Sequence, residues 1–197
     1  MHVLSFASVV DIDLSLLAPE RVRPLRRSEY DHMVALGMFD EERIELLCGI
    51  LVAMSPQGAP HANIAARLGN LLTLALGDAS WVRVHSPLAL SDESEPEPDV
   101  AVVAPGDYSI DHPTRALLVV EVADSSLRKD QKIKAGLYAR AGIPEYWIVN
   151  VQDRSVEMYR EPRDGQYATV ESRGPGDVLS PIELGGVKVA VSDFLPA

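Results

Sequence analysis

Two carboxylates and the stretch of chain between them are the first feature of this sequence that could do chemistry. Asp99 and Glu121 each belong to a short run rich in β-branched residues, and residues 105–115 connect the two runs. If this connection is a symmetric hairpin centred on Ile110, the two carboxylates face each other with Cβ atoms about 4.5–5.5 Å apart. Carboxylates this close repel each other unless a proton or a cation lies between them, and oxygen ligands suit magnesium or manganese. The spacing therefore predicts a divalent-metal site at Asp99 and Glu121.

A lysine follows the second carboxylate. Asp130, Lys134 and Tyr138 are four residues apart, so they are expected on one face of a helix. A partly exposed Lys134 beside two metal-bound carboxylates could stabilise the charge that develops on a phosphate, or orient the attacking water. The alternative is that Asp130 and Lys134 form a surface ion pair of about 0.3–0.5 kcal/mol without a function. The face of the helix that is expected to pack on the sheet consists of Ile133, Leu137 and Ala141.

The N-terminal part of the chain predicts a helix followed by a β-hairpin. The helix is expected over residues 28–36, with Ser28 as N-cap and Gly37 as its end. The sequences RIELL and ILVAM flank Cys48-Gly49, which is typical of a hairpin with a two-residue turn. The buried stripe of the helix is expected to be Tyr30, Met33 and Val34.

The remaining pattern predicts the sheet and the helices that position the carboxylates. In order along the chain we expect a helix over residues 61–76, strands over 81–90, 99–104 and 116–123, a helix over 127–141 and a strand over 145–151. Strand 116–123 is apolar on both faces, which is typical of a central, covered strand. The last strands, including VKVAVS, are expected to complete the sheet in antiparallel fashion. The predicted fold class is therefore α/β or α+β, with a mixed central sheet flanked by helices.

Length and composition suggest one domain. The chain has 197 residues, and we expect an N-terminal extension over 1–27, a core over about 43–150 and C-terminal strands over 151–197. No apolar stretch is long enough to cross a bilayer, and the opening segment lacks the basic region of a signal peptide. The single cysteine, Cys48, cannot form an intramolecular disulfide. These features predict a cytoplasmic protein without a membrane partner.

The net charge of −11 argues against a protein that grips nucleic acid over a wide face. Basic residues do cluster locally, near the start of the chain and again over residues 128–134. Either cluster could form a confined strip that faces phosphate groups. Solvated side chains on ordinary helix faces explain both clusters equally well.

Several stretches together resemble one known family. They are RIELLCGILVAMSP, the histidine at 61 that opens a helix, EPDVAVV, LLVVEVADSS, the line Asp130, Lys134 and Tyr138, and GIPEYWIV. In order and spacing they are similar to the Uma-two family, the restriction-endonuclease domain of bacteria. The resemblance covers about residues 43–149. It implies a restriction-endonuclease-like core of the PD-(D/E)XK superfamily, whose acidic residues bind a divalent metal and which acts on nucleic acid, with DNA favoured.

The resemblance also assigns roles to particular residues. Asp99 matches the motif aspartate that follows a proline, and Glu121 matches the second acidic residue. The superfamily lysine should lie two residues after Glu121, where this chain has Ala123. Members of the family place a lysine on the following helix instead, and Lys134 stands there. Two further residues match family positions and either support the metal site or serve the fold alone: Glu45 and His61.

These observations lead to one expected function and two alternatives. We expect a magnesium- or manganese-dependent endonuclease with Asp99, Glu121 and Lys134 at its site. The first alternative is a nuclease-fold binding or regulatory module without catalysis, motivated by Ala123 and the acidic surface. The second is a structural protein that forms a homodimer through the edge of the segment VKVAVSDFL.

Overall fold

The computed structural model describes residues 19–195, so most of the predicted N-terminal extension, residues 1–27, lies outside the described residues. The first helix, α1, spans Arg27–Ala35. Its N-cap is Arg26 rather than Ser28, because the Glu29 carboxylate accepts a hydrogen bond from the Arg26 amide at 2.9 Å and caps this end. Tyr30 is buried as expected, whereas Val34 is exposed, which contradicts part of the predicted stripe.

The predicted hairpin is confirmed. Strands β1 (Ile44–Leu47) and β2 (Ile50–Ala53) pair in antiparallel fashion, with Leu47 opposite Ile50. Both residues of the Cys48-Gly49 turn have positive φ, 51° and 77°, which is the geometry of a type I′ turn. Glycine is also needed at position 49 for space, since a Cβ there would meet the Pro24 Cβ at 2.3 Å.

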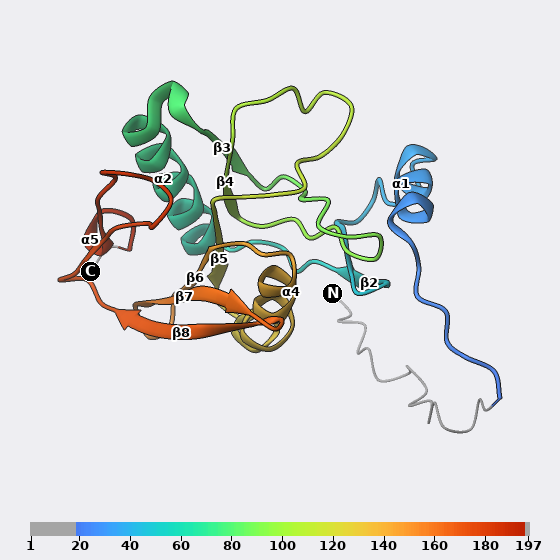
Figure 1. Cartoon of the computed structure of the whole chain (residues 1–197). Helices are drawn as coiled ribbons and strands as arrows, with labels where there is room; N and C mark the ends of the chain where they lie inside the picture. Colours follow the sequence, from blue (N-terminus) through green and yellow to red (C-terminus); the bar gives the residue numbers. More distant parts are fainter. Residues whose placement is uncertain (1–18, 196–197) are drawn as a thin grey trace.

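A six-stranded sheet forms the centre of the molecule (Figure 1). Its strands are adjacent in the order in which they occur in the sequence, and only β5 and β6 are parallel. A mixed central sheet between helices is the predicted fold class, which is therefore confirmed. The strands are β3 (Trp81–Val84), β4 (Val100–Val103), β5 (Leu118–Ala123), β6 (Glu145–Asn150), β7 (Ser155–Arg163) and β8 (Gln166–Arg173).

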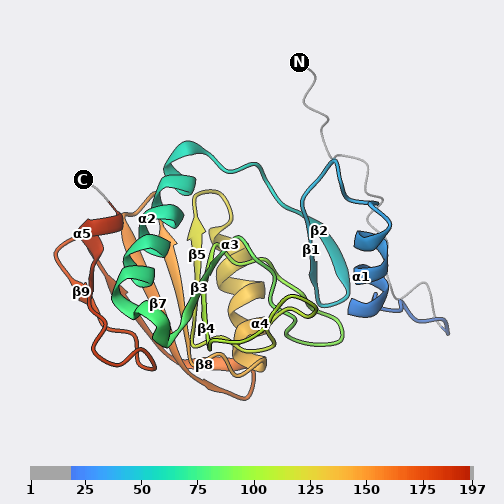
Figure 2. The same cartoon turned by 90° about the horizontal axis from the view of Figure 1, so that it is seen from above.

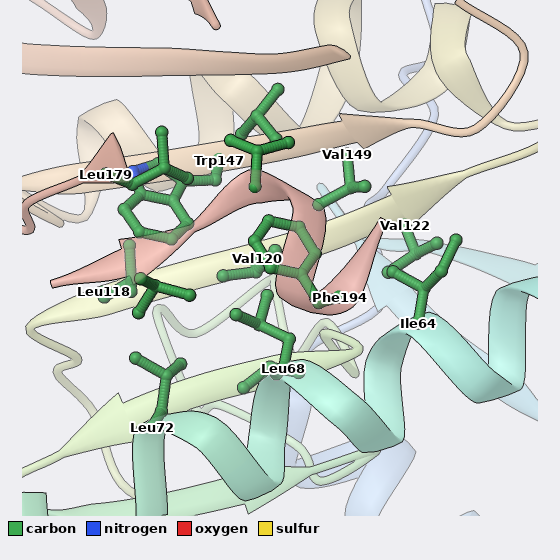
Figure 3. Close-up of a cluster of buried hydrophobic side chains, with 14 of the residues drawn as sticks. Ile64, Leu68, Leu72, Leu118, Val120, Val122, Trp147, Val149, Leu179 and Phe194 are labelled. Carbon is green, nitrogen blue, oxygen red and sulfur yellow. The ribbon is translucent and has the colours of Figure 1, made fainter. Parts of the chain in front are cut away.

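Helix α2 (Ala59–Leu76) covers one face of the sheet together with the short helix α5 (Val191–Phe194), as Figure 2 shows. A 3-10 turn, η2 (Gly77–Ala79), follows α2. None of the helices in residues 19–195 is long and apolar enough to span a bilayer. The apolar stripe of α2 packs against alternate residues of β5 and β6 (Figure 3), including Ile64, Leu68, Leu72, Leu118, Val120, Val122 and Trp147.

The other face is covered by the helix that connects the parallel strands β5 and β6. It consists of α3 (Leu127–Lys129), a π-helical turn η3 (Asp130–Lys134) and α4 (Ala135–Arg140). The predicted packing face is partly wrong, because Ile133 is 46% exposed while Lys134 is only 1% exposed. The wide π turn rotates the residues that precede it relative to α4, so the predicted α-helical periodicity does not hold across it.

The C-terminal segment differs from the prediction. VKVAVS does not extend the main sheet, because β10 (Val189–Ala190) pairs only with β9 (Val178–Leu179) in a separate two-stranded sheet and then enters α5. Val189, Val191 and Phe194 are buried in the core beneath α2. VKVAVSDFL therefore does not form the long strand edge that was expected, since burial of these side chains outweighs their strand propensity, and the homodimer stays a prediction.

Candidate active site

The pairing of β4 with β5 brings the two predicted carboxylates together. Val100 lies opposite Val120, and the same register continued by one residue places Asp99 opposite Glu121, as the hairpin centred on Ile110 predicted. Both side chains line one cavity of about 300 Å³. The cavity lies between the segment that leads into α2 and the start of the α3 helix, because residues 52–58, 124–126, 129 and 130 line its sides.

Asp99 is held by hydrogen bonds on both of its carboxylate oxygens. Its Oδ1 lies 2.9 Å from His61 Nε2 and 3.3 Å from Gln57 Nε2, and its Oδ2 accepts a hydrogen bond from the Val122 amide at 2.7 Å. Burial opposes ionisation, yet the contacts with His61, His85 and Val122 outweigh it and hold the pKa of Asp99 below its usual range. The carboxylate therefore stays charged and fixed in orientation.

His85 is a neighbour of Asp99 that the sequence interpretation missed. Its Nδ1 lies 3.3 Å from Asp99 Oδ1, and its amide donates to the Asp99 carbonyl at 3.1 Å. The residue has a φ of 46°, an uncommon conformation for a side chain of this size. Val84 pairs with Val100, so the same register arithmetic applied to β3 and β4 would have placed His85 opposite Asp99.

Glu121 is bonded to the α3–α4 helix. Its Oε1 accepts hydrogen bonds from Lys134 Nζ at 2.9 Å and from the Tyr138 hydroxyl at 2.7 Å. Burial, followed by the charges of Asp99, Asp130 and Glu45, raises the pKa of Glu121 to about 8 against the opposing effect of Lys134. A second cation beside this carboxylate would therefore stabilise its charged form.

Lys134 is a buried ion rather than the partly exposed lysine that was expected. Its Nζ lies 2.9 Å from Glu121 Oε1 and 2.9 Å from Glu45 Oε2. Although burial opposes the charge, these two carboxylates raise the pKa of Lys134. The expected surface ion pair with Asp130 is also wrong, because both residues are buried and Lys134 pairs with the glutamates instead.

Glu45 reaches the site from the N-terminal hairpin. It has no exposed surface, and its Oε1 accepts a hydrogen bond from Lys129 Nζ at 2.9 Å. Burial opposes ionisation, but the charges of Lys134 and Lys129 keep the pKa of Glu45 low. Because each of its carboxylate oxygens already lies beside an ammonium group, Glu45 stabilises the positive charges of Lys129 and Lys134.

Asp130 is the third buried carboxylate that lines the cavity. Its Oδ2 accepts a hydrogen bond from the Ser126 hydroxyl at 2.5 Å. Its Oδ1 is buried and has no hydrogen-bond partner among residues 19–195. Burial raises the pKa of Asp130. Asp130 and Lys134 are the first and last residues of the π turn, and both are buried.

The residues around the cavity fit a divalent cation. With all side chains ionised and the histidines neutral, the four buried carboxylates and the two ammonium groups leave two negative charges in excess: Asp99, Glu121, Asp130 and Glu45 against Lys129 and Lys134. The exposed Asp124 also lines the cavity and adds a further negative charge. No His, Cys, Asp or Glu cluster of three or more members in the described part of the chain is arranged to hold a metal by itself. Two carboxylates with water completing the shell are what magnesium usually takes, and Glu121 Oε2 accepts no hydrogen bond from residues 19–195.

Comparisons with known proteins agree with this picture. A solved structure from Anabaena variabilis, titled as "a putative nuclease belonging to DUF820", superposes with a TM-score of 0.71 at 14% sequence identity. The match covers 87% of this chain and 98% of that one, which shows a shared fold. No curated protein matches the chain. The model of the Uma2 family, described as "Putative restriction endonuclease", matches residues 27–192. The resemblance inferred from the sequence is thereby confirmed, and the chain belongs to the Uma2 family.

Proposed function

We propose that this protein is a metal-dependent endonuclease that hydrolyses phosphodiester bonds of nucleic acid. The observation that carries the proposal is that Asp99, Glu121 and Lys134 line one cavity, with the Lys134 ammonium 2.9 Å from the Glu121 carboxylate. Paired carboxylates beside a cationic group suit the hydrolysis of a negatively charged ester. The family description points to the same class of reaction.

Asp99 and Glu121 would hold magnesium or manganese in this site. When bound, such an ion supplies Lewis-acid stabilisation of the phosphate and lowers the pKa of a coordinated water. Asp99 is suited to this role because His61 and Val122 fix its orientation with bonds of 2.9 and 2.7 Å. His61 thus acts on the site through Asp99.

Lys134 would provide the positive charge that the chain lacks at Ala123. Its ammonium stays charged, and two of its three hydrogens are occupied by Glu45 and Glu121. The third hydrogen is available to a phosphate oxygen in the cavity. Tyr138 helps to fix Glu121, with its hydroxyl 2.7 Å from Oε1.

We further propose that the protein works as one domain in the cytoplasm. Cys48 is exposed and free, which fits a reducing compartment. DNA is the favoured substrate for a first test, because the family is described in terms of restriction endonucleases.

The test is a cleavage assay on plasmid DNA and on labelled oligonucleotides with Mg²⁺ or Mn²⁺. We expect metal-dependent cleavage by the wild type and a loss of at least about 100-fold in Asp99→Asn. Asp193→Asn is the matched control, since Asp193 is exposed on α5, on the other face of the sheet. If the wild type binds Mn²⁺ in calorimetry but cleaves no DNA or RNA, the protein is instead a binding or regulatory module.

A further inference from the structure

Three cations lie exposed along the helix formed by α3, η3 and α4. Arg128, Lys132 and Arg140 are exposed, and none of them has a carboxylate within ion-pairing distance among residues 19–195. Arg128 and Lys132 are one turn apart, and the rise of a helix separates Arg128 from Arg140 by roughly 18 Å. In a chain with a net charge of −11, these cations without a carboxylate partner offer positive charge to a phosphate backbone, and Arg140 Nη2 also lies 3.7 Å from Cys48 Sγ.

A hollow lies beside this row. It has a volume of about 390 Å³ and lies between the α4 helix and the β7–β8 hairpin. Gly136 and Gly165 line the hollow without side chains. A Cβ on Gly165 would meet the Arg140 Cγ at 2.9 Å. Its lining combines two aromatic rings, two amides and two of the cations: Tyr159, Tyr167, Gln131, Gln166, Lys132 and Arg140.

The two tyrosine rings are fixed in place. The Tyr159 hydroxyl donates to Glu157 at 2.7 Å and the Tyr167 hydroxyl donates to the Ile143 carbonyl at 2.9 Å. Their rings meet edge to face with centroids 5.9 Å apart. The Glu157 carboxylate also accepts hydrogen bonds from Gln131, so its charge is already solvated by protein donors. Rigid rings with polar edges are suited to hold a flat heterocycle.

We propose that this row and hollow form a subsite for a single strand of nucleic acid. The inference rests on the proposed nuclease function and names its substrate class. Lys129 and Asp130 of the same helix line the catalytic cavity, so the row leads away from that cavity. One line of cations matches one phosphate backbone, and the hollow has room for one unstacked base. A duplex presents two backbones, whereas this row and hollow offer a single line of contacts.

The test measures binding without catalysis. A fluorescein-labelled 12-nucleotide single-stranded DNA is titrated with full-length protein in EDTA, and anisotropy is followed at several salt concentrations. We expect Lys132→Ala and Arg140→Gln each to weaken binding about three- to tenfold and to reduce the salt slope by about 0.7. Tyr159→Leu should weaken binding about five- to tenfold through lost stacking. Arg173→Ala is the control, because Arg173 is paired with Glu171 on β8.

The outcomes separate this subsite from the proposed activity. Asp193→Asn, on α5 and on the other face of the sheet, should bind the strand as the wild type does. Loss of cleavage in every assay with strand binding intact would remove the nuclease proposal and leave the subsite. Binding by Lys132→Ala and Arg140→Gln equal to that by Arg173→Ala, or equal affinity for a matching duplex, would overturn the subsite.

Discussion

Lys134 carries a positive charge that is enclosed by protein and shared between carboxylates from distant parts of the chain. It is 1% exposed, and its partners Glu45 and Glu121 come from the N-terminal hairpin and from the central strand β5. Enclosing an ammonium is costly unless its partners remain in place. The same arrangement that keeps Lys134 charged for chemistry therefore makes it part of the core.

Lys134→Ala should consequently destabilise the fold as well as remove activity. We expect a loss of about 3–5 kcal/mol in the free energy of unfolding, because Glu45 and Glu121 would be left as buried charges without this partner. Chemical denaturation in EDTA measures the loss. Lys132→Ala, two residues away and exposed, should change stability by less than about 0.5 kcal/mol. Equal stability of both variants would contradict the buried ion cluster.

Glu95 is a buried carboxylate outside the candidate site. It is 4% exposed, its Oε2 has no hydrogen-bond partner in the described residues, and Arg27 Nη1 is 3.7 Å away. Burial, with a contribution from Asp31 and against Arg27, raises its pKa to about 7 from 4.5. Because the folded state holds this proton more tightly, the stabilising contribution is complete below pH 4.5 and is lost as the pH rises through 7.

Glu95→Gln should remove this pH dependence. We expect the variant to match the wild type near pH 4 and to exceed it by roughly 1–3 kcal/mol at pH 8, because the neutral amide carries no buried charge. Denaturant unfolding at pH 4, 6 and 8 measures the difference between the two proteins. A constant difference across these pH values would show that Glu95 does not titrate in this range.

At the scale of elements, close packing between α2 and β3 gives a test of the layered fold. Gly69 is buried on α2, and a Cβ at this position would meet the Val84 Cγ2 at 2.8 Å. Gly69→Ala gains helix propensity of up to about 1 kcal/mol but forces a clash with a stiff β-branched side chain. We expect a net loss of about 1–2 kcal/mol.

A double mutant separates the two effects. Gly69→Ala combined with Val84→Ala should be more stable than the sum of the two single changes by at least about 1 kcal/mol, since the shorter side chain removes the clash. Thermal or denaturant unfolding of the four proteins measures this coupling. Additive changes would show that α2 does not approach β3 as closely as described.

Elements with local signals were predictable from the sequence. The Cys48-Gly49 hairpin follows from turn chemistry alone, and a symmetric connection centred on Ile110 predicted the register of Asp99 and Glu121. The π turn was not predictable, because the contacts of the buried Lys134 that accompany it are with residues far away in the sequence, Glu45 and Glu121. The prediction that VKVAVS extends the main sheet was wrong for a similar reason, because Val189 and Val191 are buried against other elements.

The candidate site was predictable only in part. The opposition of Asp99 and Glu121 depends on the one connection between their strands. Their equal distance from Ile110 in the sequence was enough to predict it. The contact of Glu45 with Lys129 joins residues 84 positions apart and depends on how the hairpin docks, which no local pattern records. Predicting the position of His85 would have required the pairing of β3 with β4 as well as an uncommon backbone conformation at this residue.

At the scale of the whole molecule, a bound cation should stabilise the fold. Mn²⁺ at about 100 times its dissociation constant should add about 2.7 kcal/mol, or roughly 5–10 °C in Tm for a chain of this size. The reason is that the ion neutralises Asp99 and Glu121 in the folded state only. Calorimetric unfolding scans in Mn²⁺ and in EDTA measure the shift. Asp193→Asn should keep it and Asp99→Asn should lose it, and an equal shift in both would argue against this site.

The hairpin that carries Glu45 has a consequence for the order of folding. The strands of the central sheet pair with their sequence neighbours, and the longest connection between two of them is residues 124–144. The bond from Glu45 to Lys129 closes a far longer loop, whose entropic cost is repaid only once the sheet and the α3–α4 helix exist. We therefore expect the hairpin to dock after the transition state, with φ-values near zero. A newly made chain would then acquire its complete charge cluster only as the last contacts form.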